Sequence, residues 1–148
     1  PEITMKKPSW WKKPTADDAM LAASAASAAA FAVPMAVVPK KYLERTYEPK
    51  TAATEAQVGY SSLFTALMAA QMAAPYGDKI NEEAKKRALK VTGAGWLAIG
   101  SRGAFMMQQG LEKKEPLNYG KVAFMAAMGS ACLAQGFREK KEDKPAKK

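Results

Sequence analysis

The sequence predicts an all-α integral membrane protein with three to four transmembrane helices in the order αααα. Alanine supplies 30 of the 148 residues, and long runs of small residues favour helix over strand. Two apolar runs, at about 19–38 and 56–75, contain no charged residue. A helix on a soluble protein needs a water-facing polar stripe, but the only polar side chains in the first run are Ser24 and Ser27. We therefore expect these runs to be covered by lipid or by protein.

A basic N-terminal arm is expected at 1–14, before the first apolar run. Tryptophan beside lysine at this place is typical of an anchor in the membrane interface, and a solvated tail is the alternative. The residues expected to contact lipid or a partner are Trp10, Trp11, Lys12 and Lys13. Thr15 followed by Asp17 and Asp18 then indicates the start of a helix, because a threonine cap and acidic side chains stabilise a first turn.

A helical membrane domain is expected at 15–137, followed by a Lys-rich C-terminal tail at 138–148. Its spans lie at about 19–38, 56–75, 88–109 and 122–137. A helix of about 20 residues is about 30 Å long, which matches the hydrocarbon thickness of a bilayer. Because the spans contain much alanine and few leucines or isoleucines, their insertion free energy is marginal. A soluble Ala-rich bundle is the alternative.

Arg102 makes the third span the least secure of the four. An arginine at the centre of a bilayer costs about 2.5–3.5 kcal/mol on an insertion scale. No acidic residue lies within the four apolar segments. We therefore expect Arg102 to meet a carboxylate, backbone carbonyls, a lipid headgroup or a pigment group that a neighbouring subunit supplies.

Basic residues predict the orientation of a four-span protein. The N-terminal arm, the connection after Pro75 and the C-terminal tail carry 14 of them, and the two opposite connections carry 7. Since basic loops stay on the cytosol-equivalent side, both termini are expected in the stroma or the matrix.

Small and polar residues recur every fourth position in three of the spans. Such rows let membrane helices approach closely or form hydrogen bonds across an interface, although an Ala-rich sequence also produces them by chance. The rows are Gln57, Ser61 and Thr65; Gly100 and Ala104; and Ala126, Ser130 and Ala134.

Several kinds of chemistry are excluded by composition. The chain has no histidine, which excludes a Ser-His-Asp or Cys-His nucleophile, His-ligated haem and the usual zinc sites. Cys132 is the single cysteine, and we expect it to be a buried, inert thiol. No glycine-rich phosphate loop is present, so no nucleotide site is expected. The sequence therefore predicts a protein that is not an enzyme.

Pigment binding is possible without histidine, because a glutamine amide oxygen can ligate the magnesium of chlorophyll. Carotenoid can lie on apolar helix surfaces, and ordinary hydrogen bonds between helices are the alternative role of the glutamines. The candidate pigment ligands are Gln57, Gln71, Gln108 and Gln135.

The segment 100–106, Gly-Ser-Arg-Gly-Ala-Phe-Met, is similar over fewer than ten residues to a helix of the chlorophyll a/b and a/c light-harvesting family. That helix reads Glu-x-x-Asn-Gly-Arg-x-Ala-Met, and its glutamate holds chlorophyll. Here Leu97 takes the place of that glutamate, and Gly100 and Ser101 replace the Asn and Gly. We assign no membership on this segment.

These observations favour an accessory, structural subunit of an organellar membrane complex, bound to larger subunits and to anionic lipids. A photosystem with its antenna in the thylakoid membrane is the first expectation, because the spans are rich in Ala, Met and Gly and because Pro1 in place of Met indicates a removed presequence. A respiratory or ATP synthase complex of the mitochondrial inner membrane is the alternative. The net charge of +9 also leaves a nucleic-acid-binding protein as a second alternative, against which the two uncharged runs argue.

Overall fold

The computed structural model describes residues 14–75 and 82–139. Its five helices are α1 (Ala16–Val37), α2 (Pro39–Thr46), α3 (Glu55–Ala73), α4 (Glu82–Gln108) and α5 (Pro116–Phe137). The expected all-helical class is confirmed. Within the described residues the β-type pairing is one isolated antiparallel bridge, between Tyr47 and Glu112.

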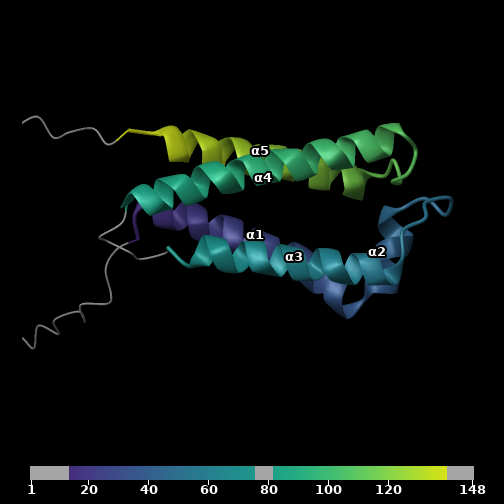
Figure 1. Ribbon diagram of the computed structural model, residues 1–148. Coiled ribbons are helices and arrows are strands. Elements are labelled where there is room, and N and C mark those ends of the chain that lie inside the picture. The colour runs from purple at the N-terminus through teal and green to yellow at the C-terminus, as the bar shows by residue number, and fades with distance from the viewer. Residues whose placement is uncertain (1–13, 76–81, 140–148) are drawn as a thin grey trace, which may run out of the picture.

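The four long helices form an antiparallel bundle of two pairs, α1 with α3 and α4 with α5 (Figure 1). Contacts within each pair are far more extensive than contacts between the pairs. The short helix α2 lies at one end of the bundle, which we call the α2 end. The start of α1, the end of α3, the start of α4 and the end of α5 lie at the opposite end (Figure 1).

Local sequence explains where these helices begin. Thr15 caps α1 and forms a capping box with Asp18, as the sequence predicts. Thr54 forms the same motif with Gln57 at the start of α3. Proline occupies the first position of α2 and of α5, where the missing N–H costs no hydrogen bond.

Two helices extend beyond the expected spans. The segment after the first span contains α2, which begins at Pro39 because proline pre-sets the first helical turn. Helix α5 begins at Pro116 for the same reason, and it contains the span expected at 122–137.

Of the spans expected from the sequence, α1 alone is long and apolar enough to cross a membrane among the described helices. The other long helices differ from it in composition. Two glutamines and four hydroxyl side chains lower the hydropathy of α3, and Lys90 and Arg102 interrupt α4. The structure therefore supports a helical bundle with one candidate span, and the three further spans stay a prediction.

The core joins three helices through one tryptophan. Trp96 of α4 is 2% exposed, and its indole N–H donates to the hydroxyl of Ser24 on α1 over 2.7 Å. Ser24 in turn donates to the sulfur of Met72 on α3 over 3.0 Å. Leu21, Leu89 and Cys132 complete this buried cluster, so the expected burial of the thiol is confirmed.

Glycines let α4 and α5 approach closely. A Cβ added to Gly129 would lie 2.8 Å from the carbonyl oxygen of Gly93, and a Cβ on Gly93 would lie 2.8 Å from the carbonyl oxygen of Gly129. Any side chain larger than hydrogen at this crossing therefore pushes the two backbones apart.

The rows of small residues have different positions in the structure. Gly100 is buried against α5, but Ala104 and all three members of the α5 row are exposed. In α3, Ser61 and Thr65 donate back to carbonyls of their own helix. The residue that bonds across the α1/α3 contact is Ser62, whose hydroxyl donates to the carbonyl of Ala32 over 2.8 Å.

Candidate functional site

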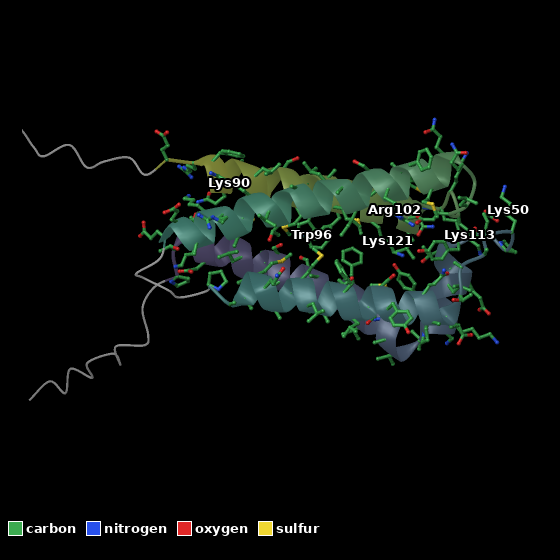
Figure 2. The ribbon with its side chains drawn as sticks, in the orientation of Figure 1. Lys50, Lys90, Trp96, Arg102, Lys113 and Lys121 are labelled. Atoms are coloured by element: carbon green, nitrogen blue, oxygen red, sulfur yellow. The ribbon has the colours of Figure 1, made fainter. Side chains whose placement is uncertain are left out.

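A cavity of about 310 Å³ lies between the two helix pairs, toward the α2 end. Its inner part is apolar and its outer part carries charged and hydroxyl groups. The apolar lining includes Phe31, Met68, Trp96, Ile99 and Met125, and the polar lining includes Tyr42, Thr46, Tyr47, Arg102, Glu112, Asn118 and Lys121. Figure 2 shows Trp96, Arg102 and Lys121 in the space between the pairs, with both cations nearer α2.

Three aromatic rings from three helices pack together at the apolar end of the cavity, and two of them, Phe31 and Trp96, line it. The ring centroids of Phe31 and Trp96 are 6.0 Å apart, and those of Trp96 and Phe124 are 6.1 Å apart in an edge-to-face arrangement. Phe31 and Phe124 are 5.9 Å apart. Aromatic pairs at these separations attract one another beyond the area that they bury, so this end of the cavity has a defined shape.

Two connections that are distant in sequence are joined at the polar end. The N–H of Lys113 donates to the carbonyl of Thr46, and the N–H of Glu48 donates to the carbonyl of Leu111, both over 2.9 Å. The hydroxyl of Thr51 also donates to that carbonyl of Leu111, over 2.6 Å. These bonds hold the side chains that follow α2 and α4 at the rim of one cavity.

The charged groups of the cavity are two cations and one carboxylate. The ammonium of Lys121 donates to the hydroxyl of Thr46 over 3.2 Å and lies 4.6 Å from the ring centroid of Tyr42. Burial raises the pKa of Glu112, and the positive charges of Lys121 and Arg102 oppose this rise. With all three groups ionised, the cavity carries a net charge of one positive unit.

Both tyrosines of the cavity keep their protons at neutral pH. Burial, with a smaller contribution from the neighbouring Tyr47, raises the pKa of Tyr42 to about 12. Burial, together with the charge of Glu112, also raises the pKa of Tyr47. Their hydroxyl groups are therefore hydrogen-bond donors and acceptors and not ionised groups.

Asn118 supplies a buried acceptor that is not satisfied by the described residues. It is 1% exposed, and its amide nitrogen donates to the carbonyls of Thr46 and Lys113 over 3.1 and 2.8 Å. These two bonds assign the amide orientation, which leaves Oδ1 without a partner in the described part of the chain. A buried polar atom without a partner costs about 1–3 kcal/mol, so a donor from a bound molecule or from a water would stabilise this oxygen.

Arg102 is the one charged residue of this cavity that the sequence singled out, and it is exposed at the rim. Glu112 is an acidic residue of this chain that is close enough for the positive charge of Arg102 to lower its pKa. Glu112 lies outside the apolar segments, in the turn after α4, and that turn returns it to the helix. Whether Arg102 also meets a partner or a lipid stays a prediction.

Apart from Ser61 and Thr65 of the α3 row, sequence reasoning missed the remaining polar residues of the cavity. Tyr42, Tyr47 and Asn118 lie in connections or first helical turns that read as ordinary loop sequence. The one signal available was the pair Asn118 and Lys121, which are three residues apart and so lie on one side of α5.

The four candidate pigment ligands are not brought together. The amide oxygen of Gln57 accepts the N–H of Thr54 in the capping box, and Gln135 donates to Asp17 over 2.7 Å. Gln71 and Gln108 are exposed, near the ends of α3 and α4 that lie at opposite ends of the bundle. Trp10, Trp11, Lys12 and Lys13, the expected interface anchor, lie outside the described residues.

A second polar cluster, at the opposite end, has a structural explanation. The ammonium of Lys85 lies 2.7 Å from a carboxylate oxygen of Asp18, with both side chains about 5% exposed or less. Lys86 lies 3.0 Å from Asp17 and also donates to the carbonyl of Gln135. This cluster joins the starts of α1 and α4 to the end of α5.

Residues 14–75 and 82–139 contain no group of three or more His, Cys, Asp or Glu side chains that could hold a metal ion. Comparison with protein-family models, with curated proteins and with solved structures gave no match to this chain.

Proposed function

We propose that this chain is a non-catalytic accessory subunit of an organellar membrane complex of the photosystem–antenna type. In this role it packs between larger membrane subunits, stabilises their contacts and binds anionic lipid. The observation that carries the proposal is an exposed apolar stripe on α3. Its members are Tyr60, Leu63, Phe64 and Leu67, with exposed fractions of 75%, 60%, 69% and 58%.

The stripe has the geometry of a docking surface. Positions i, i+3, i+4 and i+7 lie on one side of a helix, and a contiguous apolar surface of this kind marks a contact with protein or membrane. Exposed large apolar side chains also occur on the other long helices, among them Val33, Val91, Phe105 and Phe137. A bundle that is apolar on several outer faces is suited to an environment with little water.

Charges at the two ends of the bundle support the same proposal. No charged residue lies between Asp18 and Lys40, between Lys121 and Arg138, or in α3 after Glu55. In α4 the uncharged stretch between Lys90 and Arg102 is shorter, about 18 Å at the helical rise per residue. Because a hydrocarbon core is about 30 Å thick, α4 needs protein neighbours or long basic side chains that reach the polar zone.

The thylakoid membrane with stromal termini is the location that we propose, and the inner mitochondrial membrane with matrix termini is the alternative. The excess of basic residues on the terminal arm, the tail and the connection after Pro75 supports this orientation. Chlorophyll and carotenoid at subunit interfaces belong to the same proposal, with Gln71 and Gln108 as the exposed amides that remain available to face a neighbour.

Extraction and co-migration test this function. Carbonate washing of isolated membranes should leave the chain in the pellet, and release into the supernatant would overturn the membrane assignment. The double variant Leu63→Asn and Leu67→Asn should keep its helical content but lose most of its share in the complex on a native gel. Leu117→Asn is the matched control, because Leu117 is 51% exposed at the start of α5 and lies outside the stripe. Equal incorporation of both would show that the stripe is not the contact.

A further inference from the structure

We infer that the cavity at the α2 end binds a single-chain anionic lipid whose head carries one negative charge and a hydroxyl group. The ligand class is thus a lysolipid with a glycerophosphate type of head. This inference rests on the proposed function, because a membrane is the source of the ligand. It adds to that function the position of the site, the charge of the ligand and the number of its acyl chains. The site is built from residues of α1 to α5 that converge on one volume.

The charged side chains of the cavity favour a ligand with a single negative charge. Arg102 and Lys121 face the cavity from α4 and α5, and Glu112 faces it from the turn between them. Two cations and one carboxylate leave one positive charge without a counter-charge inside the cavity. A singly charged phosphodiester neutralises it, while a dianion would bring an uncompensated negative charge next to Glu112. A zwitterionic head brings its own cation and gains less from this site.

The unsatisfied oxygen of Asn118 favours a lipid head that carries a hydroxyl group. The Oδ1 of Asn118 is buried and has no donor among the described residues. An ionised phosphodiester group by itself offers only acceptors, and so would leave this oxygen unsatisfied. A head with a free hydroxyl can donate to it while its phosphate accepts from the two cations. The neutral hydroxyls of Tyr42 and Tyr47 line the same volume and add donors for phosphate oxygens.

The apolar part of the cavity selects an acyl chain. Phe31, Met68 and Trp96 line its inner end, where a free inorganic anion would gain nothing. A volume of about 310 Å³ is near the lower limit of ligand cavities, which run from about 300 to 1,000 Å³. It accommodates a head and the first part of one chain, and not two whole chains.

The rest of the chain can leave between α3 and α4. These helices make few contacts with each other, although residues of both line the cavity. Phe64 and Ile99 flank this gap and remain 69% and 39% exposed. An acyl chain that passes between them would continue over the exposed stripe of α3, toward the lipid or partner that covers the stripe.

Quenching of Trp96 tests the inference directly. In a Trp10→Phe, Trp11→Phe background, Trp96 is the single remaining tryptophan. The full chain is held in nonionic detergent, and the probe is lysophosphatidylglycerol with bromine on its acyl chain. Lysophosphatidylcholine with the same brominated chain is the matched probe, because it enters the micelle equally but carries no net charge. We expect saturable quenching by the first lipid and at least about tenfold weaker quenching by the second.

Variants locate the site. Arg102→Gln and Lys121→Gln should each weaken the binding of the anionic lipid by at least about tenfold, since each removes a charge-assisted hydrogen bond. Lys113→Gln is the control, because Lys113 is half-buried at the same end but does not line the cavity. It should bind like the unsubstituted chain. Far-UV circular dichroism identifies any variant that fails to fold, and the comparison of the two lipids needs no variant.

Three results would overturn the inference. These are equal quenching by both lipids, unchanged binding in both cavity variants, and displacement of the probe by chainless glycerophosphate at equal concentration, which would indicate a soluble-anion site. The two proposals can fail separately. If carbonate releases the chain but the two lipids still differ in quenching, the membrane-subunit proposal is wrong and the lipid site stands. If the chain stays in the pellet but the two lipids quench equally, only the lipid site is wrong.

Discussion

The indole N–H of Trp96 lies 2.7 Å from the hydroxyl of Ser24, so that one hydrogen bond joins α4 to α1 across the centre of the bundle. Both residues are almost completely buried, and the hydroxyl of Ser24 in turn donates to the sulfur of Met72 on α3. The two helix pairs also meet through ion pairs at one end of the bundle, where Lys85 and Lys86 contact Asp18 and Asp17. The Trp96 bond is the polar link at the centre of the bundle, and because Trp96 lines the cavity, this bond helps to fix the shape of the cavity.

Ser24→Ala should destabilise the fold by about 1–3 kcal/mol, because it leaves a buried indole N–H without an acceptor. Ser27→Ala is the matched control, since the hydroxyl of Ser27 donates only to the carbonyl of Ala23 in its own helix. Thermal unfolding of both variants in the same detergent measures the difference. Adding Trp96→Phe to Ser24→Ala should cost less than the sum of the two single changes, and strict additivity would show that the bond contributes nothing.

Gly129→Ala should destabilise the bundle by about 1–3 kcal/mol, as expected for overpacking. The new methyl group would lie 2.8 Å from the carbonyl oxygen of Gly93 and force α4 and α5 apart. Gly120→Ala is the control in the same helix, because a Cβ there meets nothing within 4 Å. It should stabilise the chain by about 0.5–1 kcal/mol through helix propensity. Opposite shifts of the melting temperature are the expected result, and two shifts of the same sign would contradict the close crossing.

Lys85→Ala should destabilise the fold by about 3–5 kcal/mol, because it leaves the carboxylate of Asp18 buried without its cation. The matched control is Arg87→Ala. Arg87 and Glu83 form an ion pair 3.4 Å apart with exposed side chains, and a surface pair of this kind contributes little. Chemical unfolding should separate the two variants clearly. If both cost the same, the Lys85 pair is solvated in solution.

Glu112→Gln should change the pH dependence of stability. Burial raises the pKa of Glu112 above its ordinary value of 4.5. The folded state therefore binds this proton more tightly than the unfolded state, and the resulting stabilisation is present below pH 4.5 and lost as pH rises through the folded pKa. Relative to Glu112→Gln, the unsubstituted chain should thus lose stability as pH rises from about 4 to 7.

The measurement is the difference in melting temperature between the two proteins across this range, which cancels the titration of all other groups. Glu115→Gln is the control, because the side chain of Glu115 is exposed three residues further on. Its difference from the unsubstituted chain should stay flat. A difference for Glu112→Gln that is flat or of opposite slope would mean that Lys121 and Arg102 outweigh the cost of burial.

The sequence by itself determined the local features of this protein. Helix was predictable because alanine-rich runs and the caps at Thr15 act over a few residues. The absence of charge from 19–38 was visible directly. The end of α4 was also predictable, since Gly110 adopts a φ of +67° that glycine tolerates best.

Only the tertiary structure decided which polar residues face one another. Glu112 is ten residues from Arg102, a separation at which helical periodicity predicts no contact, and a turn brings the two together. Ser24 and Trp96 are 72 residues apart, and their sequence context does not distinguish them from Ser27 or an anchoring tryptophan. The physical reason is that small, uniform residues pack in many registers. Gly93, Gly129 and the Trp96 hydrogen bond select one register, and that selection places two cations, one carboxylate and an unsatisfied amide oxygen around a single cavity.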